Sequence, residues 1–195
     1  HFMLKEILEQ PRVIADCLSG RIDPRRKRVQ LPELEGLPTP ERLKIVACGT
    51  SYHAGLWAKH LFEHWTGIEV EVDIASEFRY RTLRFRPGDM VLGITQSGET
   101  ADTLAGLRIA KEHQVPVLGL CNVLGSTVAR EADRVMYTQA GPEISVASTK
   151  AMCSQMTALL LLALFWGRKQ GMVPPALERT ILDHLQALPR VLEQE

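Results

Sequence analysis

The sequence predicts an α/β protein with a five-stranded, doubly wound parallel sheet and helices on both faces. Three observations support this fold class. Five apolar segments of strand length recur between residues 43 and 138. A stretch with helical spacing of apolar residues follows each segment. The segments are joined by helical stretches rather than by hairpin turns, as parallel strands with right-handed crossovers require.

The first 41 residues are expected to lie outside the sheet. Residues 2–19 carry apolar side chains at helical spacing and predict one amphipathic helix, which Pro11 should kink or divide. Residues 20–41 hold four prolines and the basic run 25–28, which we interpret as a solvated linker. A nucleic-acid partner is not predicted, because the chain has 23 basic and 23 acidic residues.

The repeating unit begins at residue 43. Residues 68–74 alternate apolar with acidic side chains, which is typical of a strand at a sheet edge. Pro116 lies near the start of the fourth strand, where a missing N–H donor is tolerated. The expected strands are 43–47, 68–74, 90–94, 115–121 and 134–138, and the expected helices between them are 52–66, 75–80, 100–113 and 126–132.

Two more helices are expected after the last strand, at residues 146–166 and 176–188. The most apolar run, 158–166, is nine residues long. A membrane span needs about 20, so we predict a buried helix and no membrane partner. Because the helix 146–166 is apolar nearly all round, it should also form an interface, with a second copy or an absent domain. The predicted domains are 1–41 (N-terminal helix and linker), 42–170 (sheet domain) and 171–195 (C-terminal helical extension).

Several kinds of site find no support in the sequence. The four cysteines have no close pair, so reduced thiols in a cytoplasmic protein are expected. His60 and His64 are four residues apart on one helix, but no third ligand is near, so no metal is predicted. Neither G-x-G-x-x-G nor G-x-x-x-x-G-K-[ST] occurs, and no cofactor is predicted.

Two turns rich in hydroxyl groups follow the first and third strands. Residues 48–51 read Cys-Gly-Thr-Ser, and residues 95–100 read Thr-Gln-Ser-Gly-Glu-Thr. In the flavodoxin-like strand order 2-1-3-4-5 these strands are neighbours, so both turns border one crevice at the carboxyl ends. Helix starts offer unpaired N–H groups there, which predicts a small anion such as phosphate as the ligand. Helix caps alone would explain either turn, but two turns on one crevice favour a ligand.

Two further features lie near this crevice. Cys48 with His53 as base could be a nucleophile, but no third orienting group is evident, so we interpret Cys48 as a small residue at a strand end. Residues 141–150 lead into the next helix and place Ser148 and Thr149 at its start. These hydroxyls either cap the helix or form a wall that closes over the ligand.

Four segments resemble the glutamine:fructose-6-phosphate aminotransferase family, also called glucosamine-6-phosphate synthase. They are residues 48–52, 75–81, 96–104 and 146–151, and the opening segment 1–11 is similar to the start of the family's isomerase part. The resemblance covers nearly the whole chain and implies the sugar isomerase (SIS) fold. It also implies fructose 6-phosphate or glucosamine 6-phosphate as the ligand, and amino transfer with ketose–aldose isomerisation as the reaction.

The resemblance implies a role for each matching position. The residues expected to bind substrate are Cys48, Gly49, Thr50, Ser51, Thr95, Gln96, Ser97, Thr100, Val146 and Ser148. By this resemblance the phosphate would be held by Ser51, Gln96, Ser97 and Thr100, with Thr50 assisting through its loop. Val146 and Ser148 would contact the sugar. Thr95 stands where the family usually has serine, which keeps the hydroxyl and adds a methyl group. Cys48 matches a small residue of the pocket wall.

The resemblance also implies that the chain is catalytically incomplete. The family enzyme has an N-terminal glutaminase domain, a second SIS half and a C-terminal tail, and the latter two carry the glutamate, lysine and histidine of the isomerisation. These would lie beyond Glu195, so no catalytic residue is assigned here. The expected partners are those domains and a second copy in a homodimer.

Two other functions stay open at this stage. One is a two-half amino-sugar-phosphate deaminase of the same fold, which residues 75–81 and Glu99 disfavour. The other is a non-catalytic SIS module that senses sugar phosphates. Such a module needs an attached DNA-binding or partner domain, and the sequence shows no helix-turn-helix pattern.

Overall fold

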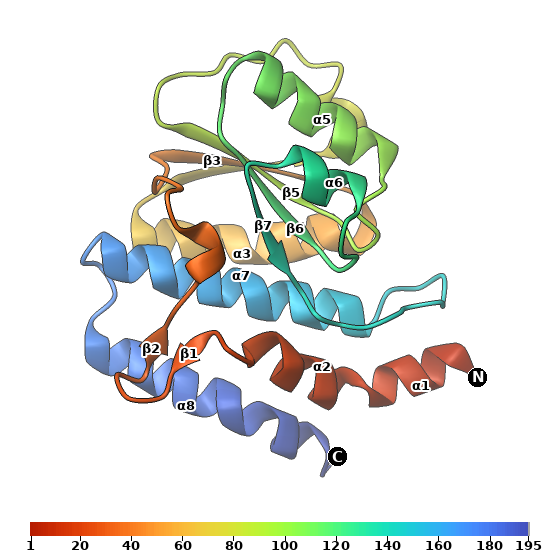
Figure 1. Ribbon diagram of the computed structural model, residues 1–195, viewed down its shortest axis with the longest axis vertical. Helices are drawn as coiled ribbons and strands as arrows, with labels where there is room; N and C mark the ends of the chain where they lie inside the picture. The colour runs from red at the N-terminus through yellow and green to blue at the C-terminus, as the bar shows by residue number, and fades with distance from the viewer. Residues whose placement is uncertain (195) are drawn as a thin grey trace.

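The computed structural model describes residues 1–194, and its centre is a parallel sheet of five strands (Figure 1). The strands run in the order β4-β3-β5-β6-β7, and every neighbouring pair is parallel. In chain order this is 2-1-3-4-5, so the predicted fold class and strand order are confirmed. The strands are β3 (Arg42–Ala47), β4 (Glu69–Ile74), β5 (Asp89–Ile94), β6 (Val117–Cys121) and β7 (Arg134–Tyr137).

Burial follows each strand's place in the sheet. Every residue of β5 and β6 is buried, as expected for central strands covered on both faces. At the predicted edge, β4 keeps acidic side chains partly exposed. Strand β6 begins two residues later than predicted, at Val117. Pro116 has no N–H to donate and contributes only its carbonyl, which accepts the Val91 N–H at 2.9 Å.

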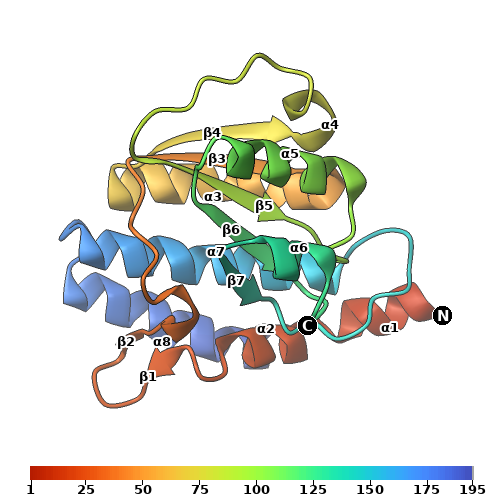
Figure 2. The ribbon, with the colours of Figure 1, turned by 45° about the horizontal axis from the view of Figure 1, so that its top comes forward.

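Helices cover both faces of the sheet (Figures 1 and 2). Helices α3 (Gly49–Thr66) and α7 (Lys150–Lys169) lie over one face, and α4 (Ala75–Phe78), α5 (Ala101–Glu112) and α6 (Thr127–Glu131) lie over the other. The core is divided accordingly into two apolar clusters. Ile45 belongs to the first cluster and Val46 to the second, because successive side chains of a strand point to opposite faces.

Helix α7 is a core helix. It packs against α3 on one side and α2 (Gln10–Leu18) on the other, and α8 (Pro175–Leu192) packs in turn on α2 (Figure 1). Within residues 1–194, α7 alone is long and apolar enough to cross a membrane, but 72% of its most apolar window is buried inside this chain. Burial on two sides explains why α7 is apolar nearly all round.

The N-terminal segment is more structured than predicted. The expected single helix is divided at Glu9 into α1 (Phe2–Leu8) and α2, with Pro11 in the first turn of the second helix. The expected linker contains a short antiparallel pair, β1 (Ile22–Asp23) with β2 (Arg28–Val29), and the 3-10 turn η1 (Pro32–Leu34). Residues 25–27 of the basic run lie in the turn of this pair, where the Asp23 carboxylate accepts the backbone N–H groups of Arg25 and Arg26 at 2.9 and 3.1 Å.

Two helix starts differ from prediction, and both differences affect the site. Helix α3 begins at Gly49 instead of residue 52, so residues 50 and 51 lie in its first turn. Helix α7 begins at Lys150, so the prediction of a helix from residue 146 is wrong. The Glu143 carboxylate accepts the N–H groups of Thr149 at 2.9 Å and Ala151 at 3.1 Å, which fixes the start of α7 there.

Candidate functional site

The turns after β3 and β5 leave the sheet side by side. Ala47 pairs with Ile94 in the parallel register, and the residues that follow them are Cys48 and Thr95. Helices α3 and α5 then continue on opposite faces of the sheet (Figure 2). The structure therefore brings the two predicted turns to the same edge of the sheet, at the point where the strand order reverses.

The turn of residues 95–100 is closed by its own hydroxyl groups. The Thr95 side chain is 3% exposed, and its Oγ1 lies 2.8 Å from Thr100 Oγ1. The same oxygen accepts the Gly98 N–H at 3.3 Å. Ser97 Oγ accepts the Glu99 N–H at 3.1 Å. These contacts fix the positions of three hydroxyl groups before any ligand arrives.

The hydroxyl groups of the two turns do not cap the helices that follow. Thr100 is the N-cap residue of α5 and Cys48 that of α3, and neither side chain makes a capping hydrogen bond. The first-turn N–H groups of both helices therefore lack a side-chain cap and can serve a bound anion. The geometry thus disfavours capping alone as the explanation for these residues.

Two glycines of the turns have a left-handed backbone, but their surroundings differ. Gly98 has φ +70°, and a Cβ there would lie 2.0 Å from Ser126 Oγ, so the turn packs tightly on the segment before α6. Gly49 has φ +57°, and a Cβ there would meet nothing within 4 Å. The space beside Gly49 is open, which lets a ligand approach the start of α3.

Glu99 brings a negative charge into the turn, but its carboxylate is engaged elsewhere. Glu99 Oε1 accepts the Thr127 N–H at 2.8 Å, at the first residue of α6. This hydrogen bond holds the pKa of Glu99 below its ordinary value. The carboxylate thereby stabilises the start of α6 and leaves the crevice side of the turn to hydroxyl and N–H groups.

Ser51 has a buried partner that sequence reasoning missed. Ser51 is 7% exposed, and the side-chain amide of Gln155 donates to its Oγ at 3.0 Å. Gln155 is 2% exposed on α7, and its Oε1 has no hydrogen-bond partner within residues 1–194. A glutamine inside an apolar helix was the available signal, because a buried amide needs a polar partner.

The third predicted segment is the loop of residues 141–149, which connects β7 to α7. Val146 is fully exposed and Ser148 is half-buried, and both lie in the loop instead of in the helix. Asn122, which follows β6, links this loop to the turn after β5. Its N–H donates to the Gln96 carbonyl at 3.0 Å, and its side-chain amide donates to the Gly141 carbonyl at 2.7 Å. The motifs gave no sign of this role.

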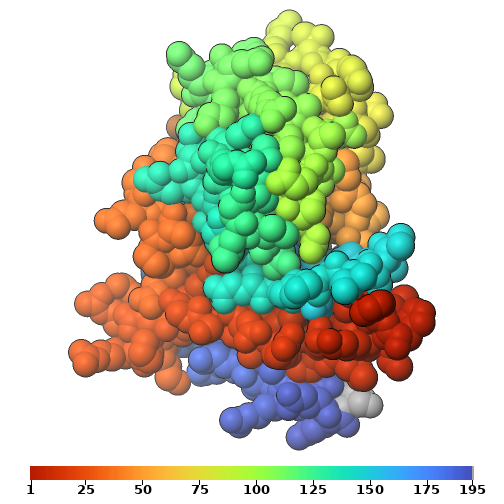
Figure 3. Space-filling model, turned by 45° about the vertical axis from the view of Figure 1, so that its right-hand side comes forward, coloured from red at the N-terminus to blue at the C-terminus, as the bar shows by residue number. Residues whose placement is uncertain are grey.

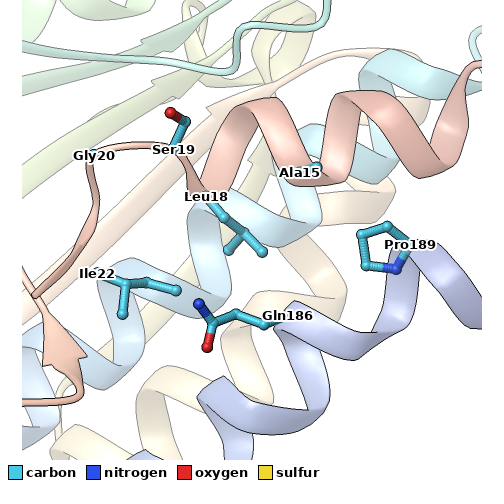
Figure 4. Close-up of a pocket in the computed structure, with 7 residues that line it drawn as sticks. All are labelled: Ala15, Leu18, Ser19, Gly20, Ile22, Gln186 and Pro189. Atoms are coloured by element: carbon cyan, nitrogen blue, oxygen red, sulfur yellow. The ribbon is translucent and has the colours of Figure 1, made fainter. Parts of the chain in front are cut away.

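One hollow of the molecule lies apart from both turns. A hollow of about 380 Å³ lies between the end of α2 and α8, and no charged side chain lines it (Figure 4). Its lining residues are Ala15, Leu18, Ser19, Gly20, Ile22, Gln186 and Pro189. In the part of the chain that the structure describes, no three His, Cys, Asp or Glu residues are placed to hold a metal ion.

Thr95→Val should disrupt the turn, because it keeps the side-chain shape but leaves the Gly98 N–H and the Thr100 hydroxyl without their partner. We expect a loss of about 1–2 kcal/mol in the free energy of unfolding and roughly tenfold weaker phosphate binding. Thr95→Ser keeps the hydroxyl and should bind phosphate as the unchanged chain does. Urea unfolding and calorimetric titration with phosphate measure both effects. Equal behaviour of the valine and serine variants would contradict the role of this hydroxyl.

The chain is an α/β domain with a parallel 2-1-3-4-5 sheet and two hydroxyl-bearing turns at the carboxyl ends of neighbouring strands, which is where ligands bind in folds of this class. The family model of the SIS domain matches residues 37–165. The chain belongs to the SIS domain family.

Similar proteins share one description. The chain is 50% identical over 194 residues to a glutamine–fructose-6-phosphate aminotransferase (isomerizing) of Symbiobacterium thermophilum, covering 97% of this chain and 32% of that protein. It is 51% identical over 174 residues to the protein of the same description from Streptomyces coelicolor, covering 87% of this chain and 28% of that protein. The chain thus spans about a third of the length of these relatives.

A solved structure matches nearly all of the fold. The C-terminal domain of the glucosamine–fructose-6-phosphate aminotransferase from Francisella tularensis superposes with a TM-score of 0.91 at 36% identity. The match covers 97% of this chain and 54% of that chain. This chain therefore corresponds to about half of that domain.

Proposed function

We propose that this chain is the sugar-phosphate-binding SIS half of a glucosamine-6-phosphate synthase, which converts fructose 6-phosphate to glucosamine 6-phosphate. The single observation that carries the proposal is the convergence of two hydroxyl-bearing turns, which the pairing of Ala47 with Ile94 sets side by side. Their hydroxyl groups are not used as helix caps. The similarity to glutamine–fructose-6-phosphate aminotransferases supports the choice of ligand.

The phosphate is expected to lie across the starts of α3 and α5. Both helices point their first-turn N–H groups at the crevice, and each helix start carries a partial positive charge. The side chains that would complete the site are Thr50, Ser51, Thr95, Gln96, Ser97 and Thr100. Because the site uses no lysine or arginine, it recognises phosphate by directed hydrogen bonds instead of by net charge.

The sugar would extend from the phosphate toward the loop of residues 141–149. Asn122 connects that loop to the phosphate turn through Gln96 and Gly141. Val146 and Ser148 would contact the sugar from this side, with Cys48 and Gly49 at the pocket wall. This arrangement binds and orients the substrate, whereas proton transfer between C1 and C2 needs a base that we assign to another part of the parent enzyme.

The proposed partners follow from the length of the relatives, of which this chain spans about a third. A second SIS half and a glutaminase domain would complete the parent enzyme, which we propose to be a cytoplasmic homodimer. An apolar groove of about 280 Å³ between α2, α7 and α8 could bury part of such a contact. We also propose that residues 42–170 form the sugar-phosphate-binding domain and that residues 1–41 and 171–195 are extensions of it.

Calorimetric titration tests the ligand directly. The chain is expected to bind glucosamine 6-phosphate at least about tenfold more tightly than glucosamine, because the charged phosphate oxygens accept several hydrogen bonds from the two turns. Inorganic phosphate should compete with the sugar phosphate. Equal affinity for glucosamine 6-phosphate and glucosamine would overturn the phosphate assignment.

A further inference from the structure

The loop of residues 141–149 is held by a carboxylate near the N-terminus of the chain. Glu6, on α1, is 3% exposed. Its carboxylate accepts the Ile144 N–H at 2.6 Å, the Ser145 N–H at 3.2 Å and the Ser145 hydroxyl. Figure 3 shows the loop (cyan) lying along the N-terminal helices (red). Three donors to one buried carboxylate make a specific anchor rather than a chance surface contact.

Helix α1 is attached to the molecule by this polar contact and not by an apolar face. Within α1, which the structure describes in full, Glu6 is the one buried residue. The large apolar side chains Phe2, Leu4 and Leu8 are 59%, 58% and 71% exposed. The amphipathic pattern of the sequence therefore does not describe how α1 packs in this chain. Glu6 is placed inward because the loop supplies its hydrogen-bond donors.

A second carboxylate holds the other end of the loop. Lys150, the first residue of α7, is 1% exposed, and its Nζ lies 2.6 Å from Glu9 Oε2. A buried ammonium group at a helix N-terminus is unfavourable for two reasons, desolvation and the positive end of the helix dipole. The negative charge of Glu9, at the junction of α1 and α2, offsets both of these unfavourable effects on the Lys150 ammonium group. Glu143 adds hydrogen bonds to the N–H groups of Thr149 and Ala151.

We propose that Glu6 and Glu9 are positioning residues of the sugar-phosphate site, acting through the loop that carries Val146 and Ser148. The inference rests on the proposed function and deepens it. Anchors at residues 144, 145 and 150 leave only a short stretch between them, and that stretch contains both sugar-contacting residues. The N-terminal helices thus set the sugar side of the pocket, while the turns after β3 and β5 set the phosphate side.

The reason for such anchors is entropic. An unanchored loop would have to be ordered when the sugar binds, and fixing one residue's backbone costs about 1–2 kcal/mol. Freeing one residue or two is expected to weaken sugar-phosphate binding about tenfold. Binding of inorganic phosphate should not change, because phosphate does not reach the loop.

Glu6→Gln tests the proposal in the full chain, because it keeps the side-chain shape and removes the charge that the three donors share. The dissociation constants of glucosamine 6-phosphate and inorganic phosphate are measured by calorimetry for the same sample. We expect about tenfold weaker binding of the sugar phosphate and less than twofold change for phosphate. Hydrogen exchange at the backbone N–H groups of residues 144 and 145 should become faster.

Two further variants separate positioning from folding. Lys150→Met replaces the buried ammonium group by an apolar chain of similar size, which preserves the fold but removes the link to Glu9. As in Glu6→Gln, the affinity for glucosamine 6-phosphate should fall relative to the affinity for inorganic phosphate. We call this quotient the ratio of affinities. Glu178→Gln is the matched control, since Glu178 is 1% exposed and accepts the Val29 N–H at 2.8 Å far from the loop. It should lower stability and leave the ratio unchanged.

The outcomes distinguish this inference from the function on which it rests. If the unchanged chain fails to bind glucosamine 6-phosphate, the proposed function is overturned, and the positioning role with it. If the unchanged chain binds but Glu6→Gln and Lys150→Met keep its ratio of affinities, only the positioning role is overturned. A shift of the ratio in both variants, absent in Glu178→Gln, supports it.

Discussion

Gly98→Ala should abolish phosphate binding and destabilise the whole turn of residues 95–100. The added methyl group would lie 2.0 Å from Ser126 Oγ and 2.4 Å from Ser126 Cβ, closer than atoms can approach. The positive φ adds about 1–2 kcal/mol of backbone strain, and the overpacking adds about 1–3 kcal/mol. Because the turn must move away from α6, its Thr95 and Thr100 hydroxyls lose the arrangement that presents them to the crevice.

Gly125→Ala is the matched control for this variant. Gly125 has φ +68°, close to the +70° of Gly98, but a Cβ there would meet nothing within 4 Å. It should show only the strain of the left-handed backbone, about 1–2 kcal/mol in urea unfolding, and keep its phosphate affinity. The difference between the two variants therefore isolates the contact with Ser126. If both lost the same stability and the same affinity, tight packing of the turn would not be the cause.

The meeting of the two turns could be predicted because it depends on local patterns and one topological rule. Five strand-length apolar segments with helical connections define the sheet, and the order 2-1-3-4-5 makes the first and third strands neighbours. The strand order alone then predicts that the two turns lie side by side, with the hydroxyls of Thr50, Ser51 and residues 95–100. No side-chain contact has to be known for this prediction. The pairing of Ala47 with Ile94 confirms that step.

The residues that hold the crevice together could not be predicted in this way. Gln155 contacts Ser51 across 104 residues of sequence, and Glu6 contacts Ser145 across 139. Such contacts depend on how α7 and α1 pack, which neither periodicity nor turn chemistry specifies. The start of α7 was misplaced for the same reason. The contacts of Glu143 with the N–H groups of Thr149 and Ala151 end the loop at Lys150, and no spacing of apolar residues specifies them.

Gln155→Glu is expected to have the largest effect on ligand affinity among variants that leave the turns themselves intact. In the present chain the amide N–H of Gln155 donates to Ser51 Oγ at 3.0 Å. A hydroxyl has one proton, so an incoming N–H occupies a lone pair and leaves that proton free to donate to a phosphate oxygen. A carboxylate at the same position can only accept, so it would take the Ser51 proton for itself.

The charge adds to this reversal of the hydrogen bond. Two unit charges about 7 Å apart repel by roughly 2 kcal/mol at an effective dielectric constant of ~20, which corresponds to about 30-fold in affinity. Burial should raise the pKa of the new carboxyl, so the loss relative to the unchanged chain should shrink as the pH falls and the group becomes neutral.

Gln155→Met and a double variant with Ser51→Ala separate the two contributions. Gln155→Met removes the donor without adding charge and should weaken phosphate binding only a few-fold, about the value of one hydrogen bond. In the Ser51→Ala background the glutamate substitution can act only by repulsion, so its effect should be smaller than in the unchanged chain. Calorimetry with glucosamine 6-phosphate compares the unchanged chain with Gln155→Glu, Gln155→Met, Ser51→Ala and the double variant. An affinity of Gln155→Glu equal to that of the unchanged chain would contradict the placement of the phosphate beside Ser51, because neither the loss of the Ser51 proton nor the repulsion between the two charges would then be seen.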